Sequence, residues 1–298
     1  MKNFALIGVG GYIAPRHLRA IKDTGNRLIA ALDKHDSVGV LDSYFPEADF
    51  FTEFERFDRH IEKLKRQGIK LDYLSVCSPN YLHDAHIRFG LRVGAHVICE
   101  KPVVLNPWNI EALQEIEKET ERSVYTILQL RLHPSIIALK DRVAQQHPDQ
   151  KCNVNLNYIT CRGHWYHNSW KGDIQKSGGI ATNIGVHFFD MLIWIFGPVI
   201  RSEVIVHSGT KAQGKLNLRG ADVTWNLSID INDIPAEIKE RGIRTFRQLT
   251  IDDTAFEFSE GFTELHTTSY QNILNGNGFG LSETLASIQL VHDIRNGA

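Results

Sequence analysis

The segment Gly8 to Ala14 carries glycines at a spacing that suits dinucleotide binding. It follows an apolar run over 4–9 and precedes a helical pattern that begins near Ala14. Gly8 permits a tight turn, Gly10 lets the backbone approach a pyrophosphate, and the N–H groups of the following helix direct partial positive charge at that anion. The expected nucleotide-binding turn comprises Gly8, Gly10, Gly11, Tyr12 and Ile13.

The glycine fingerprint is incomplete, and an acidic residue further along supports it. Ile13 occupies the third position of the Gly-x-Gly-x-x-Gly pattern, and Asp33 stands 20 residues later, at the end of the next apolar run. A carboxylate there accepts hydrogen bonds from ribose hydroxyls and disfavours a 2′-phosphate, which favours NAD over NADP, although Lys34 beside it favours the opposite. The alternative is a plain tight turn and a solvated carboxylate.

A parallel sheet must position these residues, and the first part of the chain has the pattern of one. Short apolar runs occur at 4–9, 27–32, 71–77, 95–99 and 124–128. Helical patterns alternate with them at 15–24, 56–67, 83–93 and 106–121. This alternation predicts a doubly wound parallel sheet, a Rossmann domain, which we assign to 1–122.

The remainder, 123–298, has a different pattern. Apolar residues alternate with polar ones, with a period of two residues, at 153–160, 203–206, 222–231, 245–251 and 254–258. Helical patterns lie at about 179–196 and 281–295. These features predict an α+β domain with a large, mainly antiparallel sheet that has one polar face.

The composition limits the function further. The 33 Lys and Arg against 35 Asp and Glu give a net charge of -2, which excludes the broad basic field of a nucleic-acid-binding protein. The four cysteines are too far apart for a Cys-x-x-Cys pair and suit a reduced, cytoplasmic chain. No cluster shows metal-ligand spacing, so no metal is expected. The longest apolar run, 188–200, is too short to span a membrane at ~20 residues.

Several motifs resemble those of the glucose-fructose oxidoreductase and inositol dehydrogenase family. Ser78 to His83 resembles the family's Thr-Pro-x-x-x-His, Glu100-Lys101-Pro102 its Glu-Lys-Pro, and Ser177 to Asp190 its Gly-Gly…Asp-x-Gly-x-His-x-x-Asp. The resemblance implies an NAD-dependent hydride transfer, a C-terminal substrate-binding and oligomerisation domain, and a homotetramer. Beyond the glycine turn and Asp33, the cofactor contacts expected are Cys77, Ser78, Pro79, Asn80, His83, Glu100, Lys101 and Gln129.

Within that family the segments 162–172, 183–187 and 278–292 resemble one subgroup, the UDP-N-acetyl-2-amino-2-deoxyglucuronate 3-dehydrogenases. The subgroup oxidises the sugar C3 hydroxyl on the route to 2,3-diacetamido uronic acids of bacterial surface polysaccharide, including O-antigen. Some of its members recycle NADH with 2-oxoglutarate. The resemblance therefore implies a UDP-sugar uronate as substrate and 2-oxoglutarate as a candidate hydride acceptor.

Two residues are candidates for the proton transfer that this oxidation needs. A hydride leaves carbon and a proton leaves oxygen, so a side chain must accept the proton. Lys101 follows a strand at its carboxyl end, but an ordinary lysine with a pKa of ~10.4 is a poor base at neutral pH. His187 needs no large shift. We expect His187 to be the base and protonated Lys101 to orient the hydroxyl, with the reverse assignment open.

Asn183 stands four residues before His187, where much of the wider family has Asp. That spacing places the two side chains on one helix face. The Asn183 amide can form hydrogen bonds without carrying the negative charge that would repel a uronate. We therefore expect Asn183 to be a catalytic residue together with Lys101 and His187. The alternative is a helix-capping Asn.

The run 162–176 combines basic and aromatic residues that suit an anionic nucleotide sugar. Such residues can pair with phosphates or a carboxylate and stack on a base, while the alternative is a solvated loop whose aromatics dock on the core. The expected substrate contacts are Lys101, Arg131, Arg162, Trp165, Tyr166, Trp170, Lys171, Asn183 and His187. Asp190 is either a site carboxylate or the polar side of its helix, and we favour the latter.

Two other functions stay open. One is a dehydrogenase of another sugar or polyol in the same family. The other is a non-catalytic dinucleotide-binding sensor, against which the presence of both Lys101 and His187 argues.

Overall fold

Six parallel strands form the sheet of the first of two units into which the chain divides. A computed structural model describes residues 1–145, 147, 150–258 and 264–297. The first unit comprises Met1–Val104, Trp108–Gln129 and Thr263–Thr284, and the second comprises Leu105–Pro107, Leu130–Phe262 and Leu285–Ala298.

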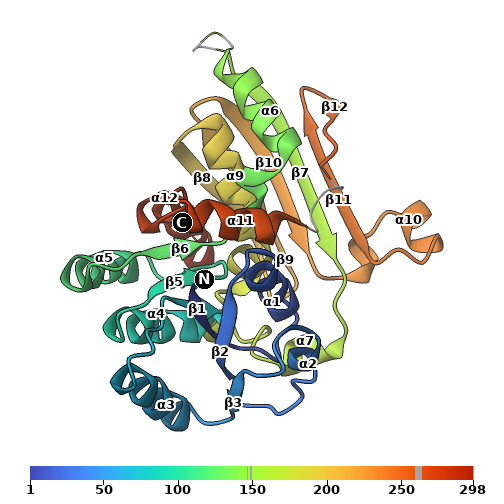
Figure 1. The fold of residues 1–298 in the computed structure, drawn as a ribbon. Coiled ribbons are helices and arrows are strands. Elements are labelled where there is room, and N and C mark those ends of the chain that lie inside the picture. Colours follow the sequence, from blue (N-terminus) through green and yellow to red (C-terminus); the bar gives the residue numbers. More distant parts are fainter. Residues whose placement is uncertain (146, 148–149, 259–263, 298) are drawn as a thin grey trace. The chain divides into compact units, whose positions relative to one another are not determined.

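The sheet of the first unit has the order β3-β2-β1-β4-β5-β6, which is that of a Rossmann fold (Figure 1). Its strands are β1 (Asn3–Ile7), β2 (Arg27–Leu32), β3 (Asp49–Phe51), β4 (Tyr73–Val76), β5 (His96–Cys99) and β6 (Val124–Thr126). Its helices are α1 (Ala14–Asp23), α2 (Val40–Tyr44), α3 (Phe54–Arg66), α4 (His83–Arg92), α5 (Trp108–Thr120) and α11 (Leu265–Leu274). The predicted parallel α/β architecture is confirmed.

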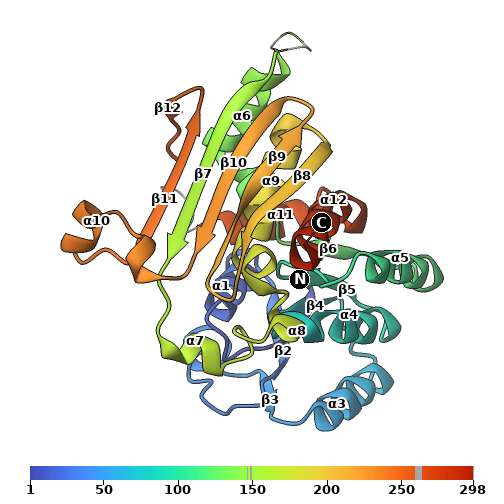
Figure 2. The same ribbon diagram turned by 180° about the vertical axis from the view of Figure 1, so that it is seen from behind.

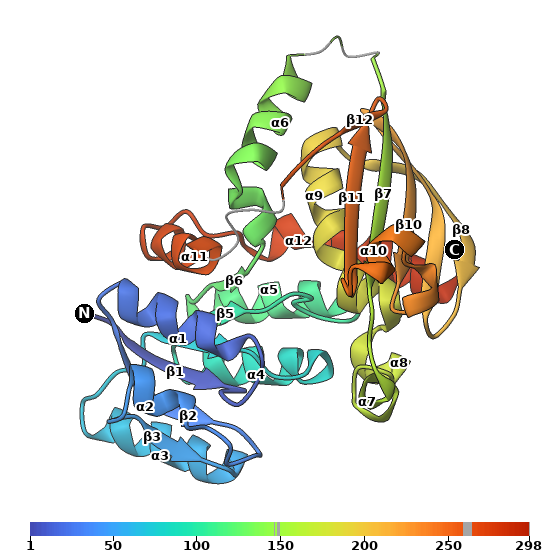
Figure 3. The ribbon, with the colours of Figure 1, turned by 90° about the vertical axis from the view of Figure 1, so that its right-hand side faces the viewer.

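One helix of this unit comes from far along the chain. Helix α11 packs beside α1 (Figures 1 and 3), and Tyr270 and Ile273 join the apolar cluster that contains Phe4, Leu18 and Ile21. The sequence pattern did not predict α11, because its buried face carries polar side chains.

The second unit is built on a mixed sheet in the order β12-β11-β7-β10-β9-β8. Its strands are β7 (Cys152–Thr160), β8 (Val199–His207), β9 (Lys211–Leu218), β10 (Ala221–Ser228), β11 (Thr245–Ile251) and β12 (Thr254–Ala255). The pair β7 and β10 is parallel and the other pairs are antiparallel, so the predicted mainly antiparallel sheet is confirmed.

Helices cover one face of this sheet. Helix α9 (Val186–Phe196) lies on it with α6 (Pro134–Ala144) alongside (Figure 3), and the rings of Phe189 and Trp225 meet edge to face at 5.2 Å. The other face, seen in Figure 2, carries the exposed alternate residues of β7 and β10. The remaining helices are α7 (His164–Asn168), α8 (Ile174–Ser177) and α10 (Ala236–Glu240). Helix α12 (Leu281–Asn296) begins in the first unit and ends in the second.

The segment that leads into α9 is both apolar and irregular. Residues Ala181–Gly185 form a π-helical turn before α9. The stretch Ile174–Phe196 is long and apolar enough to cross a membrane, with a mean hydropathy of 1.4, but 72% of its most apolar window is buried within the protein. That burial is typical of a core helix.

Candidate functional site

The glycine residues after β1 form a tight turn in the first unit. Gly8 follows β1 with a φ of +90°, and a Cβ there would lie 2.6 Å from the Cys77 carbonyl carbon. The backbone N–H of Gly10 donates to Asp33 Oδ2 at 2.9 Å. Only glycine fits at position 8, since any side chain would collide with the loop after β4.

Several predicted cofactor contacts lie around this turn. Gly11 and Ile13 are half-buried, whereas Tyr12 is 91% exposed. Asp33 is half-buried at the end of β2, and its Oδ1 also accepts from the N–H of His35 at 3.0 Å. A carboxylate has about four acceptor positions, so these two bonds leave capacity for ribose hydroxyls.

The side-chain amide of Gln129, three residues after β6, is buried. Gln129 is 9% exposed, and its Oε1 has no hydrogen-bond partner among the described residues. A buried acceptor without a partner carries a desolvation cost that a ligand donor would remove. The glycine turn, Asp33 and this amide therefore fit a bound dinucleotide.

His83 joins the two loops that carry the family motifs. Its ring nitrogens lie 2.7 Å from the carbonyl oxygen of Pro102 and 2.8 Å from that of Ser78. Burial holds the pKa of His83 below its ordinary value. Since both nitrogens face the backbone, His83 positions the loops around half-buried Lys101.

The neighbouring loop residues are also enclosed by protein. Cys77, Ser78 and Asn80 are 8%, 8% and 6% exposed, and Pro79 separates the last two. The Ser78 hydroxyl is 2.8 Å from His86 Nδ1.

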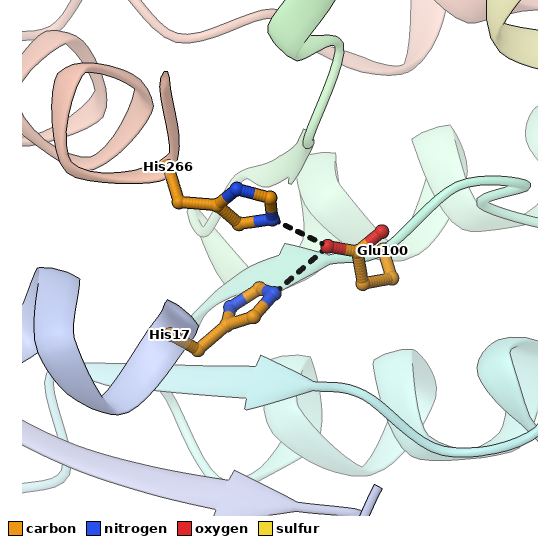
Figure 4. A group of neighbouring side chains, drawn as sticks. All are labelled: His17, Glu100 and His266. Atoms are coloured by element: carbon orange, nitrogen blue, oxygen red, sulfur yellow. Dashed lines mark hydrogen bonds and ion pairs between the residues drawn. The ribbon is translucent and has the colours of Figure 1, made fainter. Parts of the chain in front are cut away.

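Glu100, one of the expected cofactor contacts, is held by two histidines (Figure 4). Its Oε1 lies 2.9 Å from His17 Nε2 and 3.0 Å from His266 Nε2, and all three residues are buried. The sequence showed no cluster with metal-ligand spacing, yet the fold brings the ligand atoms of these three residues within 4.8 Å of one another. Spacing could not indicate this group because α11 is distant in sequence.

In the second unit, Asn183 and His187 lie where the π-helical turn meets α9. The Asn183 side-chain amide donates to the Tyr166 hydroxyl at 3.0 Å, so Asn183 is not a helix cap. His187 is half-buried, and its ring meets that of Phe188 edge to face at 4.4 Å. Burial raises the pKa of Tyr166.

The basic and aromatic run folds into α7 and α8. Tyr166 is 1% exposed and belongs to the core, whereas Trp165 is 54% exposed. Lys171 Nζ lies 4.5 Å from the ring centroid of half-buried Trp170, and Arg162 is exposed.

A cavity opens beside this run, within the second unit. It has a volume of about 250 Å³, and Lys171, Ser177, His207 and Ser208 supply polar groups to its lining. That volume is below the range of roughly 300–1,000 Å³ for whole-ligand pockets.

Arg131 and Asp190 form a buried ion pair in the same unit. Asp190 is 2% exposed, so it lies on the buried side of its helix and not on a polar one. The Arg131 guanidinium donates to both of its oxygens, at 2.6 and 2.8 Å.

Comparison with known proteins assigns both parts of the chain. Residues 2–127 match the family model described as an oxidoreductase family with an NAD-binding Rossmann fold, and residues 150–223 match the C-terminal alpha/beta domain of the same family.

Solved structures of similar chains cover nearly the whole sequence. The WlbA (WbpB) dehydrogenase from Thermus thermophilus is 50% identical with a TM-score of 0.95, over 99% of this chain and 95% of that one; it was solved with NAD and alpha-ketoglutarate and with NAD and UDP-GlcNAcA. The WlbA dehydrogenase from Bordetella pertussis, 20% identical with a TM-score of 0.80 over 100% and 95%, shows the shared fold alone.

Among curated relatives, the glucose-6-phosphate 3-dehydrogenase of Bacillus subtilis is 24% identical over 257 residues, which are 81% of this chain. The match covers 65% of that relative, slightly less than two thirds of its length.

Proposed function

Because this chain belongs to the oxidoreductase family with an NAD-binding Rossmann fold, we propose that it oxidises the C3 hydroxyl of UDP-N-acetyl-2-amino-2-deoxyglucuronate with NAD. The observation that carries the proposal is the 50% identity, over 99% of the chain, to the Thermus thermophilus protein solved with NAD and UDP-GlcNAcA.

The residues of the first unit would bind the dinucleotide. The Gly8 to Ile13 turn and the N-terminus of α1 would hold the pyrophosphate, and Asp33 would hold the ribose. The Gln129 amide would contact the nicotinamide side. NAD, when bound, accepts a hydride.

The remaining step is the removal of a proton from the C3 hydroxyl. In our proposal, neutral His187 takes this proton, and the Lys101 ammonium donates a hydrogen bond to the same oxygen and stabilises the developing alkoxide. Asn183 orients the sugar without adding a negative charge near the uronate.

The substrate carries a diphosphate and a carboxylate, so it needs local positive charge. Lys171, which lines the cavity of the second unit, and exposed Arg162 would supply it. Trp165 would offer a face to the uracil ring.

Formation of reduced cofactor tests this function. Purified protein is mixed with NAD and UDP-GlcNAcA, and absorbance of NADH is followed with and without 2-oxoglutarate. UDP-GlcNAc, which carries a hydroxymethyl group in place of the carboxylate, is the matched control. Myo-inositol and glucose 6-phosphate represent other substrates of the family. Turnover restricted to the uronate supports the proposal. A flat trace with the uronate in both conditions, or faster turnover of another sugar, contradicts it.

We also propose that the chain works as a homotetramer in the cytoplasm, in the biosynthesis of surface polysaccharide, with 2-oxoglutarate as hydride acceptor. All four cysteines are buried, and Cys77, Cys99 and Cys161 are free thiols, which suits a reducing compartment. Light scattering after gel filtration measures the mass, and a monomer would contradict the tetramer.

A further inference from the structure

Five buried side chains of the first unit form one hydrogen-bonded chain. The Ser75 hydroxyl is 2.7 Å from the Tyr270 hydroxyl, which is 2.7 Å from His17 Nδ1. His17 Nε2 and His266 Nε2 then both meet Glu100 Oε1. None of the five is more than 6% exposed. The chain links β4, α1, the end of β5 and α11.

The chemistry of the groups fixes where the protons lie. Burial holds the pKa of His17 below its ordinary value, and the two histidines hold that of Glu100 well below its own. An ionised Glu100 only accepts, so both histidines donate to it through Nε2–H. Neutral His17 then has a bare Nδ1, which accepts from the Tyr270 O–H, and the Tyr270 oxygen accepts from Ser75. Each hydrogen-bonding proton of these five side chains therefore has a single position.

His266 supports the same assignment. Its Nδ1 has no hydrogen-bond partner among the described residues. On an imidazolium this atom would be a buried donor without an acceptor, which is costly, whereas on a neutral ring it is a bare lone pair. The group therefore carries one buried negative charge, on Glu100.

We propose that His17, His266 and Tyr270 are positioning residues that hold Glu100 as an anion, and that this anion keeps the adjacent Lys101 protonated during hydride transfer. The inference rests on the proposed function, in which the Lys101 ammonium stabilises the alkoxide.

Lys101 is the cation next to Glu100 in the sequence. The His83 ring lies 2.7 Å from the carbonyl oxygen of Pro102, the residue after Lys101. Cys77, Cys99 and Tyr270 also lie near Glu100, and burial raises the pKa of each, so all three stay neutral. Arg16, which directly precedes His17, is a second cation near the group. Lys101 directly follows Glu100 in the chain. The Glu100 charge therefore has a cation beside it whose protonation it can control.

A metal ion is the competing occupant of this group. Two histidines and a carboxylate can ligate zinc, which requires both Nε2 atoms to be deprotonated and a fourth ligand to complete the tetrahedron. The contacts of 2.9 and 3.0 Å to one carboxylate oxygen are hydrogen-bond distances, and His17 takes its orientation from Tyr270 without an ion.

The pH profile of turnover tests the effect on Lys101. Glu100→Gln keeps an oxygen for the histidines and removes the charge. Loss of a nearby opposite charge lowers the pKa of an ammonium, by roughly one unit when the charge is partly screened. The alkaline limb of the kcat profile should therefore move to lower pH by about one unit. An active Glu100→Gln enzyme with both limbs unchanged would overturn the proposal.

A second measurement does not depend on turnover. In protein labelled with 15N-histidine, His17 and His266, identified by His→Gln variants, should each show one protonated nitrogen, Nε2, at pH 7.5. Tyr270→Phe should perturb only the His17 Nδ1 signal and lower Tm by about 3 °C.

Tyr73→Phe is the matched control for that variant. The Phe4 ring stacks on both tyrosines, at 5.0 Å for Tyr73 and 5.9 Å for Tyr270, so both changes delete one hydroxyl from the same aromatic group. Tyr73→Phe should leave the His17 and His266 signals unchanged.

The outcomes separate the two proposals. Absence of turnover with the expected histidine signals contradicts the proposed function and leaves the hydrogen-bonded chain supported. A doubly protonated His17 or His266 would contradict the proposed hydrogen-bonded chain. One equivalent of zinc in the purified protein, measured by elemental analysis, would also contradict it.

Discussion

Arg131 and Asp190 meet in a bidentate ion pair inside the second unit, where their side chains are only 6% and 3% exposed. Removing one partner from such a pair leaves a buried charge, which costs about 3–5 kcal/mol. We therefore predict that Asp190→Ala lowers the free energy of unfolding by that amount, measured by urea denaturation. The double variant Arg131→Met/Asp190→Leu should regain most of it.

The exposed pair of Arg66 and Glu62, 3.2 Å apart on α3, is the control for this prediction. Glu62→Ala should change the free energy of unfolding by less than about 1 kcal/mol. Equal losses for Glu62→Ala and Asp190→Ala would show that burial of the Arg131 pair is unimportant.

The two candidate proton-transfer residues should respond differently to substitution. Removal of a general base lowers kcat by about 10²–10⁴-fold, and the His187→Ala enzyme should also lose the acidic limb of its pH profile. Lys101→Ala should lower kcat while keeping that limb. NADH formation across pH measures both, and near-native turnover by either variant would remove that residue from the mechanism.

Asn183 should discriminate between charged and neutral sugars. Its bond to buried Tyr166 holds the amide in place, so Asn183→Asp exchanges an anchored neutral group for a charged one. An anion there repels a uronate, and we expect kcat/KM to fall more for UDP-GlcNAcA than for a neutral UDP-sugar. Tyr166→Phe, which keeps position 183 neutral, should lower both values equally. Equal losses for Asn183→Asp would contradict the charge argument.

Asp33 should set the preference for NAD over NADP. Its carboxylate already fixes the Gly10 loop, so Asp33→Asn keeps part of that bond and removes the charge that repels a 2′-phosphate. We predict that the ratio of kcat/KM for NADP to that for NAD rises roughly tenfold or more, about 1.4 kcal/mol. An unchanged ratio would mean that Asp33 acts only on the loop.

Stability should fall as the pH is lowered from 6.5 towards 4. Burial lowers the pKa of His86 from 6.5 to about 4, so the unfolded chain binds the proton more tightly between these values. Protonation of His86 then stabilises the unfolded state relative to the folded state, by at most about 3 kcal/mol below pH 4. His86→Asn should flatten the dependence of unfolding free energy on pH in this window. His35→Asn, at an exposed position, is the control and should not flatten it.

Local patterning was sufficient for most elements of the Rossmann half, although strand β3 and helix α2 were not predicted. The strand at 27–32 has the predicted bounds, and helices α1, α3 and α4 begin and end within two residues of the prediction. Each element there has its own apolar period and its own stop signal, such as Gly94 with a φ of +88° after α4.

Elements whose inward residues are small or polar escaped the sequence analysis. The buried residues of β9 include Ala212 and Gly214. Position 214 has no room for a side chain, because a Cβ there would lie 2.6 Å from the Trp225 ring. On α11 the buried face carries His266, Ser269 and Tyr270. Hydrophobic periodicity detects neither kind of packing.

The sequence by itself determined the fold class, the dinucleotide turn with Asp33, and the motifs that name Lys101 and His187 as the residues to test. Only the tertiary structure decided which polar groups are satisfied by protein. It placed Glu100 between His17, 83 positions before it, and His266, 166 positions after it. It also placed Arg131 against Asp190, 59 positions away. Hydrogen bonds and burial depend on distance in space, and residue spacing reports that distance only within a single helix or strand.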